Sequence, residues 1–374
     1  MPNLRFPEYT DEWKESELQD ISKISKGSGI SKDQLSENGT PCILYGELYT
    51  KYKSEIISEV LSKTEINEKN LVHSRKNDII IPSSGETAID ISTARYIPFD
   101  DIFIGGDLNI IRLHDQDGRF FSYQLNGVRK LDIAKIAQGV SVVHLYGENL
   151  KKLKVKFPSI KEQNKISSLL TIIDERIVTQ SKIIEDLEKL KSAIRNRVFY
   201  RILLKYEPNM QIGDVLSYEQ PTRYIVSDTE YSNESALIPV LTANKAFILG
   251  YTDDSDGVYR KGECIILDDF TLDCKIVDFP FKVKSSAIKI LTTKANINIR
   301  YMYEYLKYLD LVTSEHKRHY ITEVEPMEIA IPSQTEVDSI VRLFNAIDKR
   351  CSVAQDTFRR FQTQKRYLLN QMFI

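Results

Sequence analysis

The chain lacks the residue patterns on which several kinds of site depend. Its four cysteines lie far apart and form no Cys-x-x-Cys pair, so they indicate neither a disulfide framework nor a zinc site. Among five histidines only His316 and His319 are close, with no cysteine or carboxylate cluster at ligand spacing, which is typical of a surface pair. We therefore expect no metal site and ordinary thiols.

Long apolar runs are also missing. No stretch approaches 18 consecutive apolar residues, and the first eight residues contain no run of the signal-peptide kind. With 42% hydrophobic and 28% charged residues, the composition is that of a globular protein. We expect a cytoplasmic protein without a membrane span.

Motifs that carry catalysis are absent as well. The sequence contains no Pro-Pro pair, which the base-holding turn of an adenine methyltransferase needs, and no GxxxxGK[ST] phosphate loop. No Pro-Asp dipeptide occurs, so the usual carboxylate set of restriction nucleases lacks its first element. The Gly105-Gly106 pair is too short for a dinucleotide loop. We expect no catalytic residues and no cofactor in this chain.

What the chain does contain is an internal repeat. The segment 158–199 recurs without a gap as 332–373, at an offset of 174, with eleven identical positions. At 374 residues the chain exceeds what one core usually serves, and the repeat divides it into two halves with a pseudo-twofold axis available to them.

Both copies have the pattern of a long amphipathic helix, here called the central arm (158–199) and the C-terminal arm (332–374). Apolar residues recur at steps of three, four and seven, with charged residues between them. Each arm follows a Pro-Ser pair and has a glutamate three residues after the serine, which predicts a capping box. The residues that we expect to pair the arms are Ile166, Leu169, Ile173, Ile177, Ile184, Leu187, Ile340, Leu343, Ile347, Phe358, Phe361 and Leu368.

So long an apolar stripe needs a partner. From about residue 160 to 199 no Pro or Gly interrupts the pattern, which predicts a rod of roughly 60 Å. Pairing of the two arms as an antiparallel coiled coil is the simplest solution, and helices that merely cap the neighbouring domains are the alternative.

The regions outside the arms, residues 1–157 and 200–331, contain short β-branched runs bounded by Gly, Asn, Asp and Ser. The predicted fold is therefore α+β, with two globular mixed α/β lobes joined by two long antiparallel helices. Weak parallels link the lobes: 75–81 with 260–266, 18–21 with 212–215, and 120–125 with 301–306. Arms that stay alike while the lobes diverge suggest a reader of two different half-sites.

At this point the residues resemble a known family, the specificity subunits of type I restriction-modification enzymes. The opening Leu4-Arg5-Phe6-Pro7-Glu8, Trp13 and Leu18-Gln19-Asp20-Ile21 resemble its amino-terminal signature. Glu162-Gln163 and the Ile173-Asp174-Glu175-Arg176 step resemble its conserved helical regions, and 78–87 its strand-loop element. The chain departs from the pattern at Val337, where the first arm has Gln163, and at 268–270, where the first lobe has 83–85.

The resemblance implies a non-catalytic reader of double-stranded DNA. Each lobe would be a target-recognition domain for one part of a split sequence, and the arms would set the unread spacer. The arms would also dock two modification subunits, which carry S-adenosylmethionine and methylate adenine, and restriction subunits would join that core.

Charge sets a limit on this interpretation. Residues 22–155 hold 18 Lys and Arg against 17 Asp and Glu, and residues 216–329 hold 13 against 18. Since phosphate neutralisation usually dominates DNA affinity, we expect the chain alone to bind DNA weakly. Basic clusters exist nonetheless, among them Arg129-Lys130 and Lys151-Lys152 with Lys154.

Polar residues in loops after strands are the candidates for contacts with DNA, although turn chemistry alone also explains Ser, Gly and Asn at such places. They are Lys26, Ser28, Ser83, Ser84, Glu86, Thr87, Arg95 and Gln138 in the first lobe and Arg223, Asn244, Lys245, Lys317, Arg318 and Tyr320 in the second. Two other functions remain open: a coiled-coil adaptor whose lobes bind protein, and a stand-alone nuclease or methyltransferase, against which the missing motifs speak.

Overall fold

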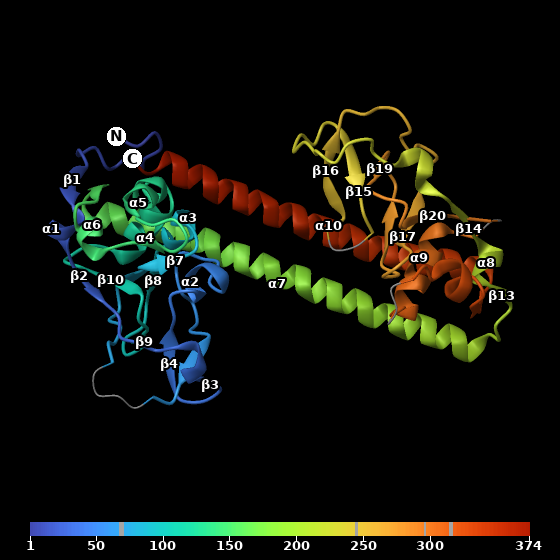
Figure 1. Cartoon of the computed structure of the whole chain (residues 1–374), viewed down its shortest axis with the longest axis horizontal. Coiled ribbons are helices and arrows are strands. Elements are labelled where there is room, and N and C mark those ends of the chain that lie inside the picture. The colour runs from blue at the N-terminus through green and yellow to red at the C-terminus, as the bar shows by residue number, and fades with distance from the viewer. Residues whose placement is uncertain (67–70, 244–245, 295–296, 314–316) are drawn as a thin grey trace. The chain divides into compact units, whose positions relative to one another are not determined.

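A computed structural model describes residues 1–66, 71–243, 246–294, 297–313 and 317–374 (Figure 1). The chain forms two compact units. Unit 1 consists of Met1–Ser181 and Asp356–Ile374, and unit 2 consists of Lys182–Gln355. The predicted boundaries separated the arms from the lobes, whereas each compact unit holds one lobe together with half of each arm.

The regular elements of unit 1 are short apart from the arms. Its strands are β1 (Lys14–Glu17), β2 (Ser22–Lys26), β3 (Leu35–Ser36), β4 (Thr40–Ile43), β5 (Ser62–Thr64), β6 (Asp78–Pro82), β7 (Ser84–Gly85), β8 (Arg95–Ile97), β9 (Phe103–Ile104), β10 (Leu108–Leu113), β11 (Val143–His144) and β12 (Lys154–Phe157). Its helices are α1 (Leu18–Ile21), η1 (Lys32–Gln34), α2 (Glu47–Thr50), α3 (Ala88–Ile91), α4 (Gly118–Asn126), α5 (Lys130–Ile136) and α6 (Gly147–Lys151).

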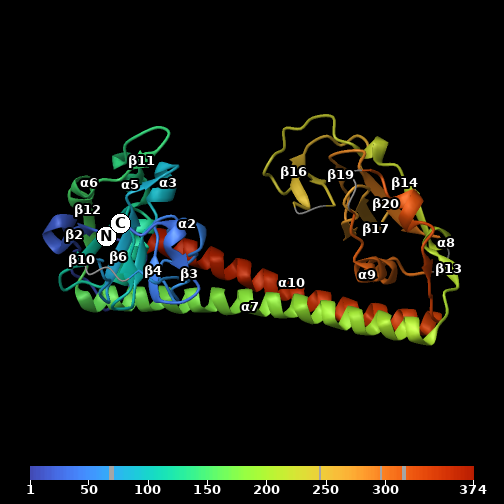
Figure 2. The ribbon, with the colours of Figure 1, turned by 60° about the horizontal axis from the view of Figure 1, so that its bottom comes forward.

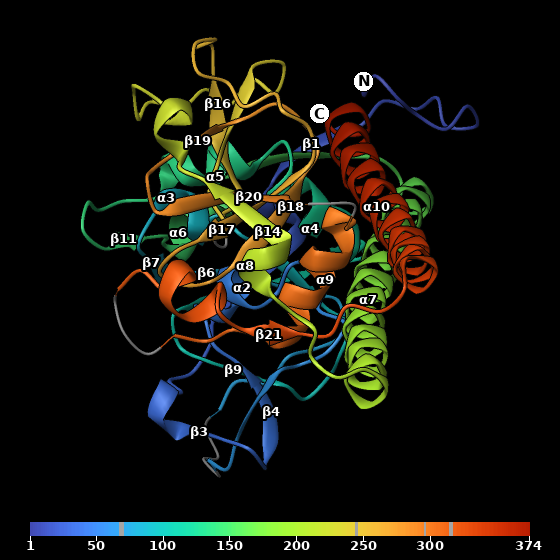
Figure 3. The same cartoon turned by 90° about the vertical axis from the view of Figure 1, so that its right-hand side faces the viewer.

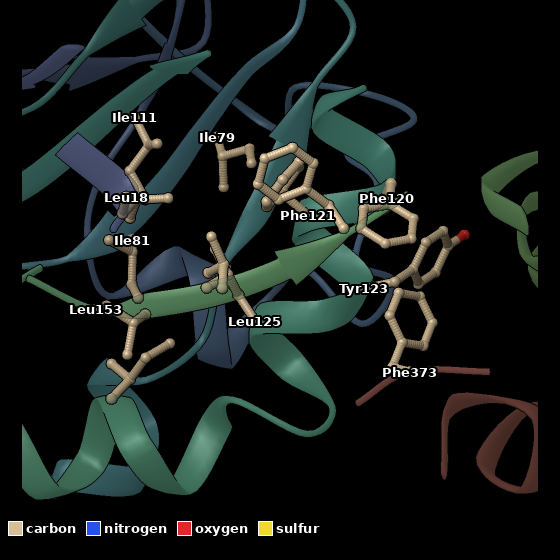
Figure 4. Close-up of a cluster of buried hydrophobic side chains, with 14 of the residues drawn as sticks. Leu18, Ile79, Ile81, Ile111, Phe120, Phe121, Tyr123, Leu125, Leu153 and Phe373 are labelled. Atoms are coloured by element: carbon tan, nitrogen blue, oxygen red, sulfur yellow. The ribbon is translucent and has the colours of Figure 1, made fainter. Parts of the chain in front are cut away.

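An antiparallel sheet in the order β2-β10-β6-β8 forms the centre of unit 1. Successive side chains of a strand point to opposite faces, so its apolar residues divide between two cores. Ile79 and Ile81 of β6 join the cluster that includes α4 and the arm ends, drawn in Figure 4, whereas Ile80 joins a second cluster. Burial on both faces explains why β6 is an unbroken apolar run rather than an alternating one.

Unit 2 has its own set of elements. Its strands are β13 (Met210–Gln211), β14 (Leu216–Glu219), β15 (Ile238–Leu241), β16 (Ile248–Thr252), β17 (Cys264–Asp268), β18 (Cys274–Val277), β19 (Lys282–Val283), β20 (Ile288–Thr293) and β21 (Glu328–Ile329). Its helices are α8 (Ile212–Val215), η2 (Pro221–Tyr224), α9 (Ile299–Leu309) and the π-turn η3 (Tyr320–Val324).

The central sheet of unit 2 has the order β14-β20-β17-β18 and is antiparallel. Its middle strand β17 repeats the division seen in β6, because Ile265 and Leu267 join one core cluster while Cys264 and Ile266 join another. Two of the predicted parallels between the lobes are confirmed: 18–21 and 212–215 form α1 and α8, and 120–125 and 301–306 lie on α4 and α9. In the third, 75–81 with 260–266, the strands correspond, but Ile79 and Ile81 match Ile265 and Leu267, one residue further along than predicted.

The arms are the helices α7 (Ile160–Lys205) and α10 (Gln334–Gln371). The predicted end of the central arm at residue 199 was too early, because the next six residues contain no helix breaker and Pro208 is the first. Among the described residues, neither arm nor any other helix is long and apolar enough to cross a membrane.

Inside each unit the arms run antiparallel. In unit 2, Lys191 binds Asp348 at 2.5 Å and, further along α7, Lys205 binds Glu336 at 3.1 Å, nearer the start of α10. In unit 1, Asp174 binds Lys365 at 2.6 Å. The predicted antiparallel pairing is confirmed.

These ion pairs use identical positions of the repeat, since Asp174 corresponds to Asp348 and Lys191 to Lys365. Each lysine also binds a carboxylate from its own lobe: Lys365 binds Glu55, and Lys191 binds Glu304 at 2.7 Å. Burial disfavours the charged form of Lys365, but Glu55 and Asp174 outweigh it and raise its pKa. Each unit thus contains a lysine between one arm carboxylate and one lobe carboxylate.

A phenylalanine fixes each arm to a lobe. Phe373, just after α10, lies with its ring centroid 5.0 Å from that of Phe120 on α4 (Figure 4). Phe199 on α7 lies 5.5 Å from Tyr301 on α9. Phe199 and Phe373 are the last identical pair of the repeat, and both of their partners open the helical segments that were matched by sequence.

Two details of the arms differ from expectation. The carboxylates of the predicted capping boxes bind side chains instead: Glu162 receives two hydrogen bonds from Arg5, at 2.7 and 2.8 Å, and Glu336 one from the Tyr206 hydroxyl at 2.7 Å. Leu343 is 41% exposed, whereas its counterpart Leu169 packs against the unit 1 core. Leu343 therefore lies outside the pairing stripe.

The other predicted arm residues follow the stripe. Those buried in or packed against a core cluster are Ile166, Leu169, Ile173, Ile177 and Leu368 in unit 1, and Ile340 and Ile347 in unit 2. Ile184, Leu187, Phe358 and Phe361 are half-buried.

Candidate nucleic-acid interface

In unit 1 the loop after β6 is held by backbone hydrogen bonds. The Ser83 amide donates to the carbonyl of Asp107 at 2.7 Å, and the Ser83 carbonyl accepts from the amide of Leu145 at 2.9 Å. The next two residues form β7, which pairs with β11. A rigid sheet thereby positions the residues that follow, Glu86 and Thr87.

A short hairpin lies beside this loop. The amides and carbonyls of Gln138 and His144 bond reciprocally, at 2.9 and 2.7 Å. Between them Gly139 has φ of 119°, and a Cβ there would lie 2.1 Å from the Val142 carbonyl oxygen, so only glycine fits. The tip residue Val140 is 95% exposed. Figures 2 and 3 show β11 and its hairpin on the side of unit 1 away from α7.

We name residues 83–87 and 138–146 edge 1. The structure brings predicted residues from both segments together, since β7 and β11 are adjacent strands. Ser83 and Ser84 are buried and serve the backbone, and Thr87 caps α3 by accepting from the Asp90 amide at 3.1 Å. Glu86 and Gln138 are exposed and free to face a ligand.

Edge 1 also contains residues that were not predicted. Val140 and Val142 are exposed apolar side chains at the hairpin tip, and His144 stacks on the exposed ring of Tyr146 at 6.0 Å. A glycine followed by β-branched residues was visible in the sequence, but the pattern also suits a buried strand. An apolar side chain can contact the methyl group of thymine in the major groove of DNA.

Glu86 also borders a cavity of about 790 Å³. Tyr45 and Tyr49 of the same lobe line it, together with Lys32. Burial, Tyr45 and Glu86 raise the pKa of Tyr49, so its hydroxyl stays protonated and can donate a hydrogen bond.

The turn that contains Lys26 and Ser28 has a mainly structural role. Ser28 Oγ accepts from the Val72 amide at 2.8 Å, and a Cβ on Gly27 would lie 2.0 Å from the Gly105 carbonyl oxygen. Close approach of two backbones thus explains this turn. Lys26 is exposed at the end of β2.

Arg95 was a wrong candidate. It is buried, and its guanidinium donates to the carbonyls of Leu48 at 3.1 Å, Tyr52 at 2.8 Å and Ala94 at 3.3 Å. Burial lowers its pKa. An arginine whose donors are spent inside the lobe cannot reach a base.

Unit 2 has a comparable edge, residues 268–271 and 317–320, which we name edge 2. After β17, Asp268 Oδ1 accepts from the amides of Phe270 at 2.9 Å and Thr271 at 3.0 Å, which makes a tight turn into β18. The Asp269 carbonyl accepts from the amide of His319 at 3.0 Å. This bond parallels the one between Leu145 and Ser83 in edge 1.

Edge 2 presents cations. Arg318 is exposed, and its guanidinium lies 5.9 Å from the Phe270 ring centroid and 3.9 Å from Asp269. Lys317 is exposed and binds Glu323 at 3.1 Å. Both predicted residues therefore lie on one surface beside the end of β17.

The remaining predictions for unit 2 have different outcomes. Tyr320 was a wrong candidate, because it is fully buried in the core cluster with its ring 5.8 Å from that of Tyr218, and burial raises its pKa. Arg223 is exposed on η2, away from the residues of edge 2 in sequence. Asn244 and Lys245 lie outside the described residues.

Nucleophilic thiols do not contribute to these edges. Burial raises the pKa of Cys42 and Cys274 to about 11 and that of Cys264 to about 12, so these thiols stay protonated at neutral pH. Within the part of the chain that the structure describes, no group of three or more His, Cys, Asp or Glu side chains could hold a metal ion.

Comparisons with known proteins agree with this architecture. Residues 10–189 match the family model described as type I restriction modification DNA specificity domain. The specificity subunit of the Escherichia coli type I restriction enzyme EcoR124I/EcoR124II is 38% identical over 154 residues, which cover 37% of this chain and 38% of that protein. The match thus spans about two fifths of the relative's length.

Two further similarities extend over nearly the whole chain. The putative type I restriction enzyme MjaX specificity subunit of Methanocaldococcus jannaschii is 20% identical, over 97% of this chain and 93% of that protein. The crystal structure of the S subunit of a type I restriction-modification system from M. genitalium superimposes with a TM-score of 0.66 at 16% identity, over 100% of this chain and 99% of the other, which establishes the fold. The chain thus contains a region that matches the type I restriction modification DNA specificity domain, and over nearly its whole length it is similar to type I restriction-modification specificity subunits.

Proposed function

We propose that this chain gives a type I restriction-modification complex its DNA sequence specificity, with edge 1 and edge 2 each contacting one part of a split target. The single observation that supports this most is that both units place a loop at the end of a middle strand of the central sheet, and that an equivalent backbone hydrogen bond in each unit joins this loop to a second segment. Four-stranded sheets with corresponding strand orders position the two edges, yet the side chains of edge 1 and edge 2 differ.

That difference suits two unlike half-sites. Edge 1 offers the Glu86 carboxylate, which can accept from the N4 amino group of cytosine, and the Gln138 amide, which can pair with adenine. Edge 2 offers Arg318 and Lys317, which pair with guanine or hold phosphates. The chain itself then needs no catalytic group.

The arms are the proposed docking surface for two modification subunits, which would carry S-adenosylmethionine and methylate adenine, and restriction subunits would join them. Supporting this, the arms expose apolar side chains that a partner could cover. They include Ile172, Val178, Ile183, Leu190, Leu343 and Val353.

Mapping of methylated adenines across the genome, in cells with and without the gene, tests the proposal. We expect a bipartite methylated motif that disappears when the gene is deleted and returns when it is restored. A motif that persists without the chain contradicts the proposal and leaves the coiled-coil adaptor as the alternative. Incubation of the purified chain with DNA and S-adenosylmethionine should give no methylation.

A further inference from the structure

A basic pocket lies beside edge 1 in unit 1. It has a volume of about 530 Å³ and is walled by α5, α6 and the start of β12. Its charged lining consists of the cations Arg129, Lys135, Lys152 and Lys154 and one carboxylate, Asp132. The fold has brought together the basic clusters at 129–130 and 151–154, which lie more than twenty residues apart in the sequence.

The carboxylates nearby do not balance this charge. Asp132 is shared by two cations, since it lies 3.2 Å from Arg129 and 3.6 Å from Lys135. Lys154 lies 3.5 Å from Glu15, which also binds a neighbouring lysine. Lys152 is exposed, and in the described part of the chain it forms no ion pair within 4.0 Å.

Arg129 lines the pocket with a side chain that is mostly buried. Its Nη2 donates to the Ile374 carbonyl at 2.9 Å, and its Nε is buried without a partner among the described residues. An unpartnered buried donor beside three lysines favours an anion that brings several acceptor oxygens. Lysines act as adaptable point charges toward phosphate.

The position of the pocket selects the anion. Gln138 lines the pocket and also begins the hairpin of edge 1, so a ligand in the pocket is continuous with whatever lies along that edge. We propose that the pocket holds a backbone phosphate of the DNA that edge 1 contacts. This inference rests on the proposed function. It assigns part of the binding to DNA phosphates to a lobe whose overall charge is close to neutral.

The test compares the charge-removing variant Lys135→Gln/Lys152→Gln with Lys63→Gln, which removes an exposed lysine from β5 in the sheet β3-β5-β4-β9 of unit 1. Lys135 is 76% exposed and Lys152 is also exposed, so both replacements spare the core, which thermal unfolding verifies. Binding of a random-sequence duplex to the full chain, assembled with its modification subunits, is measured by anisotropy over a range of salt concentrations.

Loss of one phosphate contact lowers the slope of log K against log salt by about 0.9 and the affinity at 0.1 M salt by about eightfold. We expect at least this change for the double variant and none for Lys63→Gln. A random-sequence duplex serves because phosphate contacts carry no base preference. A slope and affinity equal to those of the unaltered complex overturn the inference.

Two further results would also overturn it. If the double variant no longer assembles with the modification subunits, the pocket contacts an acidic protein surface. If inorganic phosphate or ATP raises the melting temperature of the unaltered chain but not of the variant, while the salt slopes are equal, the ligand is a free phosphate compound. Failure of the proposed function shows itself separately, as a methylated motif that does not depend on the chain.

Discussion

Lys365 in unit 1 and Lys191 in unit 2 occupy equivalent positions of the repeat, and each lies between an arm carboxylate and a lobe carboxylate. The two edges have no such identity. Edge 1 combines a carboxylate, an amide and an apolar tip, whereas edge 2 presents two exposed cations, one of them near an aromatic ring. The lysines that hold the arms to the lobes are thus the same in both units, whereas the exposed residues of the two edges differ. Different residues therefore serve assembly of the units and the proposed recognition of DNA.

The strongest test of this division exchanges a whole lobe. Replacement of residues 207–331 by the corresponding lobe of a type I restriction-modification specificity subunit should change one half of the methylated motif and leave the other half and the spacer intact. Specific binding usually exceeds nonspecific binding by about 4–10 kcal/mol, so the change should be complete rather than graded. Methylation mapping reads the result, and a change in both halves would contradict the division.

Insertion of seven residues into each arm tests the arms alone. The insertions belong between Ser181 and Lys182 and between Gln355 and Asp356, where the two units meet along the chain. Seven residues add about 10.5 Å of helix and nearly preserve the apolar stripe. We expect the spacer to lengthen by about three base pairs with both half-sites unchanged. An unchanged spacer refutes the arms as a ruler.

The equivalence of the two lysines can also be broken. Lys365→Met leaves Glu55 and Asp174 without their shared cation, which should cost unit 1 about 3–5 kcal/mol. Lys191→Met should cost unit 2 about half as much, because Arg195 still donates to Glu304 at 2.7 Å. Urea unfolding of unit 1 can be followed by Trp13, the only tryptophan, whose ring lies 5.7 Å from that of Phe120. The stability of unit 2 is measured in the same variants by hydrogen exchange of its backbone amides.

The pH dependence of the Lys365 contact is a further part of this test. The pKa of Lys365 in the folded protein is raised above its ordinary value of 10.5, so its contribution to stability is complete below that pH and is lost only as the pH rises through the raised value. The effect of Lys365→Met should therefore be constant between pH 6 and 9. Equal losses in both units would show that Arg195 does not compensate.

Single substitutions in the edges should have the smallest effects. Glu86→Gln and Arg318→Gln should each relax the preference at a base pair of one half-site, by about 1–3 kcal/mol. Glu65→Gln and Arg260→Gln, which alter exposed residues elsewhere in the same lobes, are the matched controls. Competition binding with duplexes varied one base pair at a time measures the effect, and a uniform loss over all sequences would assign the side chain to phosphate contact instead.

The pattern of apolar residues was sufficient to predict the long helices and some of the short strands. The apolar stripe predicted both arms, and the β-branched run at 79–81 predicted a strand, although its burial on both faces was not predicted. The stripe did not predict the environment of Leu343, because residues at equal helical phase meet different neighbours at different points along an arm. Leu169 has a lobe core beside it, and Leu343 faces solvent.

The candidate interface was harder to predict, because burial of a polar residue depends on the tertiary fold. Arg95 and Tyr320 were chosen for the same reason as Glu86 and Arg318, as polar residues expected in loops after strands. In the structure, however, three carbonyls accept hydrogen bonds from the arginine, and the tyrosine is buried in a core cluster. The presence of Gln138 and Glu86 in one edge depends on the pairing of two-residue strands, for which the sequence has no periodic signal. Likewise, the basic pocket needs two clusters that only the fold brings together.

The aromatic contacts at the arm ends have a practical consequence. Phe373 meets Phe120, and Phe199 meets Tyr301, so each arm has a phenylalanine in its C-terminal part that contacts an aromatic residue in the first turn of a lobe helix. A foreign lobe that carries an aromatic residue at this place should graft onto either arm without redesign. Compatible lobes could then be chosen from sequence alone, by one position, before any target sequence is known.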